Sequence, residues 1–149
     1  MTELTVVAID DQDDHEIDVD RWSALAESVL RDEGVAGLSE LNLTFIGVDE
    51  MTALNVEHMD GTGATDVLSF PLDDDGAEVF AGQPRLLGDV LICPAVVHAQ
   101  APDRADDEMA LMVVHGVLHI LGMDHQEPVE QAEMQAAEQR HLGRWRSAS

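Results

Sequence analysis

Hydrophobic positions along the chain follow two periodicities, which predict strands and helices in alternation. Residues 3–9 and 41–45 place apolar side chains at about every second position, as half-buried strands do. Residues 67–70 and 86–93 are short apolar runs, which we also interpret as strands that pair with each other. Pro71 ends the first of these runs, so we expect that strand at an edge of the sheet.

Helical spacing accounts for most of the remaining apolar residues. We expect Asp20 to cap a helix that ends at Gly34, and Asp49 to cap a shorter one. Pro94 and Pro128 can each begin a helix, and a fifth helix follows Asp103, Asp106 and Asp107. The first helix should bury Trp22, Leu25, Ala26, Val29 and Leu30, and the last should turn Val129, Ala132, Ala136 and Ala137 inward.

These elements predict an α+β fold. We expect a small mixed four-stranded sheet packed with about five helices, in one domain over residues 1–149. Residues 72–85 form an acidic, glycine-containing segment whose length without a clear pattern suggests a functional or mobile loop. Cys93, the single cysteine, excludes an internal disulfide and is expected to be buried in the last strand.

Three of the seven histidines lie within eleven residues, at His115, His119 and His125. Helix positions i and i+4 share one face, so His115 and His119 can direct two imidazoles at one point. Gly122 can then end the helix in a left-handed conformation and allow the following turn to bring His125 back. Three nitrogen ligands with an open fourth position are typical of catalytic zinc, so we expect one Zn²⁺ per chain.

The alternative is that these histidines are ordinary residues of a buried helix. Their neighbours Met112, Val113, Val114, Val117 and Leu118 are all apolar. Burying several imidazoles there without partners is unfavourable, and a shared metal removes that cost. The sequence therefore favours a metal site on a core helix and the turn that follows it.

The net charge of −24, with no lysine and seven arginines, makes most of the surface repel polyanions at long range. Arg140, His141, Arg144 and Arg146 form one basic cluster near the C-terminus. Favourable charge at a helix C-terminus explains this cluster slightly better than an RNA contact does. No apolar run is long enough to span a membrane and residues 1–4 do not resemble a signal peptide, so we expect a cytoplasmic protein.

Three motifs together resemble those of the YbeY family of bacterial rRNA maturation factors. They are H-G-x-L-H-x-x-G-x-D-H at residues 115–125, T-D-V-L-S-F-P at residues 65–71, and Gly88-Asp89 at a strand start. The histidine motif is highly specific, whereas the Gly-Asp pair alone is weak. The motif-bearing region covers residues 54–125.

The resemblance implies a metal-dependent endoribonuclease that is specific for single strands and acts in ribosomal RNA processing, including small-subunit maturation, and in ribosome quality control. It implies that His115, His119 and His125 bind the metal, and that single-stranded rRNA and ribosomal proteins or assembly factors are the partners. The family often has an arginine before the T-D-V-L-S-F strand. No arginine lies between Arg31 and Arg85 here, and His58 is the candidate substitute.

Other candidate residues follow from their positions beside these motifs. Asp124 can orient the imidazole of His125. Thr65, Asp66 and Ser69 are candidate substrate contacts. Asp66 and Asp89 could approach the metal from strand ends, although turn or cap hydrogen bonding explains both equally well.

Two other functions remain open at this point. A metallopeptidase could bind a peptide along the T-D-V-L-S-F strand, but Gly116 stands where the H-E-x-x-H motif has its general base. A non-catalytic, zinc-containing assembly factor would suit the acidic surface, because ribosomal proteins usually present basic surfaces.

Overall fold

The computed structural model describes residues 4–35, 37–59, 63–72, 85–123 and 127–148, without the side chains of residues 58, 59 and 148. Four strands form a single sheet in the order β1-β2-β4-β3. They are β1 (Leu4–Asp11), β2 (Ser39–Ile46), β3 (Val67–Pro71) and β4 (Arg85–Ile92). The pairs β1–β2 and β2–β4 are parallel, and β3 runs antiparallel to β4 at the edge. The expected mixed sheet and the edge position of residues 67–70 are confirmed.

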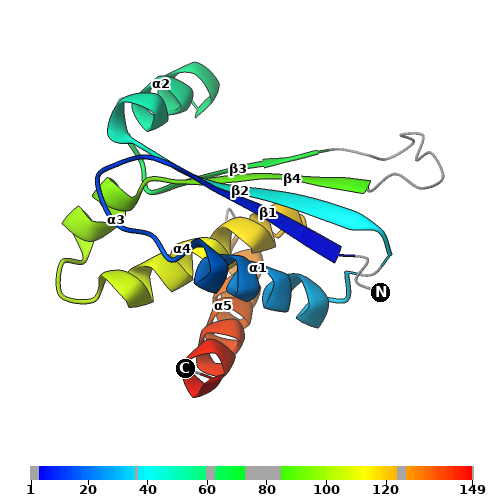
Figure 1. Cartoon of the computed structure of the whole chain (residues 1–149). Coiled ribbons are helices and arrows are strands. Elements are labelled where there is room, and N and C mark those ends of the chain that lie inside the picture. Colours follow the sequence, from blue (N-terminus) through cyan, green and yellow to red (C-terminus); the bar gives the residue numbers. More distant parts are fainter. Residues whose placement is uncertain (1–3, 36, 60–62, 73–84, 124–126, 149) are drawn as a thin grey trace.

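Five helices pack around this sheet, and the α+β class is thereby confirmed. They are α1 (Val19–Asp32), α2 (Val48–Met59), α3 (Pro94–Gln100), α4 (Ala105–Ile120) and α5 (Pro128–Ala148). Figure 1 shows α1, α4 and α5 on one side of the sheet and α2 on the other. Among the described residues, no helix has the length and apolar character needed to cross a membrane.

The main core lies between the sheet and helices α1 and α4. Alternate residues of β2, namely Leu41, Leu43 and Phe45, point into it together with Val90 and Ile92 of β4. A smaller cluster on the opposite face joins Met51 of α2 to Ile46, Leu68 and Cys93. The site described below lies on the side of the main core.

Two glycines allow the sheet and α4 to approach closely. A Cβ at Gly116 would lie 2.6 Å from Cγ1 of Val90, so only glycine fits where α4 crosses the sheet. Gly88 has φ +150°, and a Cβ there would lie 2.6 Å from the carbonyl oxygen of Phe70 and 2.8 Å from Cδ1 of Ile120. Gly88 follows a bulge in β4, where the pairing with β2 shifts register between Glu40 and Leu41. The Gly-Asp motif is therefore explained at Gly88 by packing against β3 and the end of α4.

Several boundaries differ from the sequence prediction. Asp18, not Asp20, caps α1, because its carboxylate accepts the backbone N–H of Arg21. Asp49 lies inside the first turn of α2, which begins at Val48. Cys93 is buried as expected, but it is the residue before α3 and not part of β4. Burial raises the pKa of its thiol.

The inward face of α5 was predicted wrongly. Val129 is 69% exposed, and Ala132 and Ala136 are also exposed. The buried face carries Met134, Ala137, His141 and Leu142, which share a side of the helix at spacings of three and four residues. A histidine on the buried face makes that face look less apolar in the sequence. The exposed alanines have the spacing of a buried apolar face, so the pattern favoured the wrong side of the helix.

Candidate metal and RNA-cleavage site

Helix α4 positions the first two histidines of the motif. Most of its residues from Met109 to Ile120 are buried, while Leu111, His115 and His119 form a partly exposed stripe at four-residue spacing. The two imidazoles meet edge to face, with ring centroids 4.6 Å apart. The prediction that α4 brings this pair together is confirmed.

The distance between the two imidazoles fits a shared metal ion. Nε2 of His115 lies 3.1 Å from Nε2 of His119. Two ligands of a tetrahedral zinc, each about 2.0–2.1 Å from the ion, are about 3.3–3.4 Å apart. The pair therefore needs only a small adjustment to hold an ion between its Nε2 atoms.

Glu138 of α5 fixes the orientation of the first imidazole. Its Oε2 lies 2.6 Å from Nδ1 of His115, and its side chain is 12% exposed. An ionised carboxylate only accepts hydrogen bonds, so a neutral His115 carries its proton on Nδ1 and has its lone pair on Nε2. This is the tautomer that a metal ligand needs, and carboxylates commonly enforce it at metal sites.

Glu138 was not identified from the sequence, where the orienting role fell to Asp124. Helix α5 places Gln131, Met134, Gln135 and Glu138 beside His115 in one pocket, and their spacing of three and four residues was the available signal. That signal was missed because the inward face of α5 had been assigned to the alanines.

Asp124 and His125 lie outside the described residues, as do residues 73–84 of the segment that the sequence predicts as a loop. Helix α4 does end as expected, since Gly122 adopts φ +95° after it. His58 belongs to α2, but its side chain is not among those described. The third ligand and the roles of Asp124 and His58 remain predictions.

A pocket of about 290 Å³ adjoins His115 and is lined by residues of α4, α5 and the start of β3. Asp66 and Val67 form its β3 wall. The carboxylate of Asp66 accepts the backbone N–H of Val67 at 2.8 Å and lies 3.4 Å from the hydroxyl of Thr65. Asp66 therefore lines the same pocket as His115, while its carboxylate also caps the start of β3.

Ser69 and Asp89 have structural partners. The hydroxyl of Ser69 donates to the carbonyl of Gly116 at 3.0 Å and ties β3 to α4. Asp89 accepts a hydrogen bond from Asn42 at 3.0 Å on the sheet face opposite α4, since its neighbours Gly88 and Val90 face that helix. Of the two interpretations left open for Asp89, the structure favours structural hydrogen bonding, because strand alternation directs the carboxylate away from α4. The substrate contacts of Thr65, Asp66 and Ser69 stay predictions.

Gly116 explains the missing glutamate of the peptidase motif. Its Cα faces the sheet, where a Cβ would also lie 3.3 Å from both Ser69 Oγ and Val67 Cγ2. A glutamate at this position would have to enter the packed interface between α4 and β4. The local packing therefore argues against an H-E-x-x-H type of chemistry.

A second cluster of metal-ligand type occurs where α1 ends against α5. Ligand atoms of Asp32, Glu33 and His141 lie within 4.8 Å of one another. Arg140 and Arg144 also bind these two carboxylates. Because two guanidinium groups already balance the two carboxylates, this cluster is better explained as an ion-pair network than as a cation site.

The fold and site define an α+β protein with a histidine pair on a core helix, open to a pocket beside an edge strand. The family model described as "Endoribonuclease YbeY" matches residues 8–146. The chain is 43% identical over 142 residues to the "Endoribonuclease YbeY" of Salinispora tropica, which covers 89% of this chain and 90% of that protein. The Thermobifida fusca protein of the same description is 42% identical and covers 87% of this chain and 86% of its own length.

A solution structure from Thermotoga maritima is similar in fold, with a TM-score of 0.62 and 24% identity, and covers 96% of this chain and 93% of that one. This likeness supports the fold alone. The extent and identity of the sequence matches are decisive, and the chain belongs to the YbeY endoribonuclease family. The resemblance drawn from the three motifs is confirmed.

Proposed function

We propose that this protein is a zinc-dependent endoribonuclease that cleaves single-stranded RNA during ribosomal RNA maturation, including that of the small subunit, and in ribosome quality control. Membership of an endoribonuclease family supports RNA cleavage. The convergence of His115 and His119 at 3.1 Å, with Glu138 holding one tautomer, is the observation that supports a metal centre. Residues 1–149 would form a single catalytic domain in the cytoplasm.

In this proposal His115, His119 and His125 hold one Zn²⁺. When bound there, zinc supplies a Lewis acid for a phosphate oxygen and makes a water molecule acidic enough to act near neutral pH. Glu138 keeps the proton of His115 on Nδ1, away from the metal side. The wall formed by Asp66 and Val67 limits the approach of substrate to the partly exposed side of α4.

The packing of Gly116 supports RNA over peptide as the substrate, because the position of the peptidase base is closed by β4. The net charge of −24 supports ribosomal proteins, or other assembly factors with basic surfaces, as protein partners. It also favours the non-catalytic assembly factor as the second candidate, in which the same zinc would serve a structural purpose.

Cleavage assays with and without metal test this proposal. The purified protein should cleave a labelled single-stranded rRNA fragment, leave a matched duplex and casein intact, lose activity on chelation and regain it with added Zn²⁺. If the zinc-loaded protein cleaves neither RNA nor casein, the assembly factor becomes the better account. Cleavage of casein but not RNA would favour the peptidase.

A further inference from the structure

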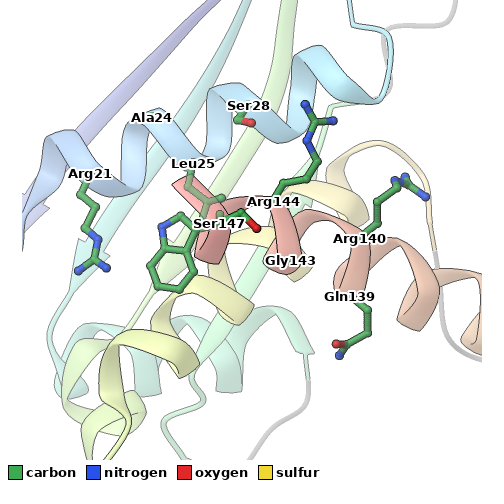
Figure 2. Close-up of a pocket in the computed structure, with 10 residues that line it drawn as sticks. Arg21, Ala24, Leu25, Ser28, Gln139, Arg140, Gly143, Arg144 and Ser147 are labelled. Carbon is green, nitrogen blue, oxygen red and sulfur yellow. The ribbon is translucent and has the colours of Figure 1, made fainter. Parts of the chain in front are cut away.

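A groove of about 1090 Å³ runs between α1 and the C-terminal half of α5, away from the pocket at His115. Arg21 of α1 and Arg140 and Arg144 of α5 line it, with Gly143 between the last two (Figure 2). The described lining includes no aspartate or glutamate, although the chain has 31 acidic residues and only seven arginines. The groove therefore gathers three of the seven arginines of a strongly acidic protein.

Carboxylates and tryptophan rings beside the groove hold the three arginines in place. Arg140 Nη2 lies 2.5 Å from Glu33 Oε2, and Arg144 binds Asp32. Arg21 lies over the rings of Trp22 and Trp145, 4.8 Å and 4.9 Å from their centroids, and reaches Asp106 at 3.1 Å. Each guanidinium has five N–H donors in a rigid fork, so one carboxylate does not exhaust it.

The side chains of Arg140 and Arg144 are 52% and 60% exposed. They can therefore donate to a ligand in the groove while they keep their carboxylates. Elsewhere the net charge of −24 opposes the approach of a polyanion, whereas here the local carboxylates are balanced by arginine. The volume of the groove is also larger than a single phosphate would fill, so it has room for several nucleotides.

We propose that this groove binds the phosphate backbone of single-stranded RNA as a second contact, separate from the metal site. The inference rests on the proposed function, because it takes the substrate of that site to extend across α5. Glu138 and Arg144 are six residues apart on this helix, or about 9 Å along its axis. Six residues at about 100° each also place the two side chains about 120° apart around the helix, so a strand that leaves the pocket at His115 passes around α5 to reach the arginines.

Gly143 offers a variant that removes none of the charged residues of the groove. A Cβ there meets no atom within 4 Å, and glycine is an unfavourable residue inside a helix, so larger side chains should be accepted. Gly143→Glu places a carboxylate between Arg140 and Arg144, and Gly143→Gln adds a side chain of nearly the same shape without charge. The two variants differ only in the property that the proposal invokes.

The binding test uses a fluorescein-labelled oligouridylate of about 16 nucleotides, measured by anisotropy on zinc-loaded protein, with probe integrity checked on a gel. Gly143→Glu should weaken binding about fivefold or more relative to Gly143→Gln. It should reduce the slope of log K against log salt by about 0.7 for each phosphate that the groove no longer binds. Tryptophan emission gives a second signal, because Trp145 lines the groove and Trp22 is the only other tryptophan.

Equal affinities and salt slopes for Gly143→Glu and Gly143→Gln would overturn the inference. So would a wild-type protein that does not bind the probe at low salt, which would leave an acidic protein segment as the better occupant. An RNA cleavage assay of the wild type distinguishes failure of the groove proposal from failure of the proposed function. Loss of binding in Gly143→Glu without any RNA cleavage by the wild type supports the groove alone, and wild-type cleavage with identical variants supports the metal site alone.

Discussion

His115 and Glu138 are joined across two helices, with Nδ1 of the imidazole 2.6 Å from Oε2 of the carboxylate. The contact links α4, which carries the histidine pair, to α5, which belongs to no family motif identified in the sequence. It makes the tautomer of a proposed ligand depend on a residue 23 positions away in the chain. The site is therefore assembled by packing as well as by the histidine motif.

This relationship predicts the effect of replacing Glu138. Glu138→Ala should weaken zinc binding by about 10- to 100-fold, as expected when a partner that orients a ligand is removed. Glu138→Gln should weaken it as well, because a neutral amide oxygen accepts the Nδ1–H bond less strongly than a carboxylate does and the amide can also turn its N–H toward Nδ1. Competition with a chromogenic chelator measures both affinities.

Gln135→Ala provides the control for this experiment, since Gln135 lines the same pocket and is exposed. It should bind zinc as the wild type does. Unchanged zinc affinity in both Glu138 variants would show that the carboxylate does not position His115.

Gly116 should be intolerant of any side chain. Gly116→Ala places a Cβ against Val90 and should cost about 1–3 kcal/mol of unfolding free energy, as overpacking of a core does. Combining it with Val90→Ala should relieve the clash, so the double variant should be more stable than the sum of the two single effects. Urea unfolding of the four proteins measures the coupling, and simple additivity would contradict the assigned contact.

Stability should fall in mild acid because of His98. Its ring stacks on His15 with centroids 3.8 Å apart, and its pKa is lowered, first by burial and then by the charge of His15, while Asp106 acts in the opposite direction. A group with a lowered pKa in the folded state is protonated first in the unfolded chain. Its stabilising contribution is therefore complete above its ordinary pKa near 6.5 and is lost as the pH falls below that value.

Thermal unfolding at several pH values tests this dependence. His98→Gln should lose part of the decline in melting temperature between neutral pH and pH values below 6.5. Asp13→Asn, at an exposed position of the same loop, is the control that leaves both imidazoles in place. An acid dependence that is identical in wild type and His98→Gln would show that the stacked pair does not contribute.

The ion-pair network between α1 and α5 should stabilise the fold without binding zinc. His141 is buried, with Nε2 2.6 Å from Glu33 and Nδ1 3.4 Å from Asp32. Glu33→Ala should therefore cost about 1–3 kcal/mol, because it removes the acceptor of a buried polar group. Glu27→Ala on the same helix breaks only the exposed pair with Arg31 and should cost less than about 0.5 kcal/mol.

Both variants should keep the zinc content of the wild type. A loss of zinc in Glu33→Ala with the fold intact would place the metal at Asp32, Glu33 and His141, and not on α4. Elemental analysis of folded protein decides between the two clusters.

The sequence predicted correctly those elements in which burial alone decides the spacing of apolar residues. The strand at residues 41–45 alternates because one face of β2 meets α1 and α4, and the histidine helix is apolar because it is covered on several sides. Helix α5 was assigned the wrong face because Met134 and His141 are buried while Ala132 and Ala136 are exposed. Tertiary contacts, not local pattern, decide that face.

The candidate site likewise combines residues that local spacing predicts with residues that only tertiary contacts reveal. Spacing alone brought His115 and His119 together, because four residues make about one helical turn. Glu138 was missed since its partner lies on another helix, and the role of Asp89 stayed open since a bulge and strand alternation decide which face it takes. Interactions between distant segments require the three-dimensional arrangement.

The most direct test of the central claim compares wild type with His119→Ala, using Gln135→Ala as the matched control in the neighbouring pocket. Zinc content and cleavage of a single-stranded rRNA fragment are measured on the same preparations, with folding checked by circular dichroism. We expect one zinc per chain and RNA cleavage in the wild type and the control, and loss of both in folded His119→Ala. Full zinc content and undiminished cleavage in His119→Ala would contradict a metal-dependent nuclease centred on α4.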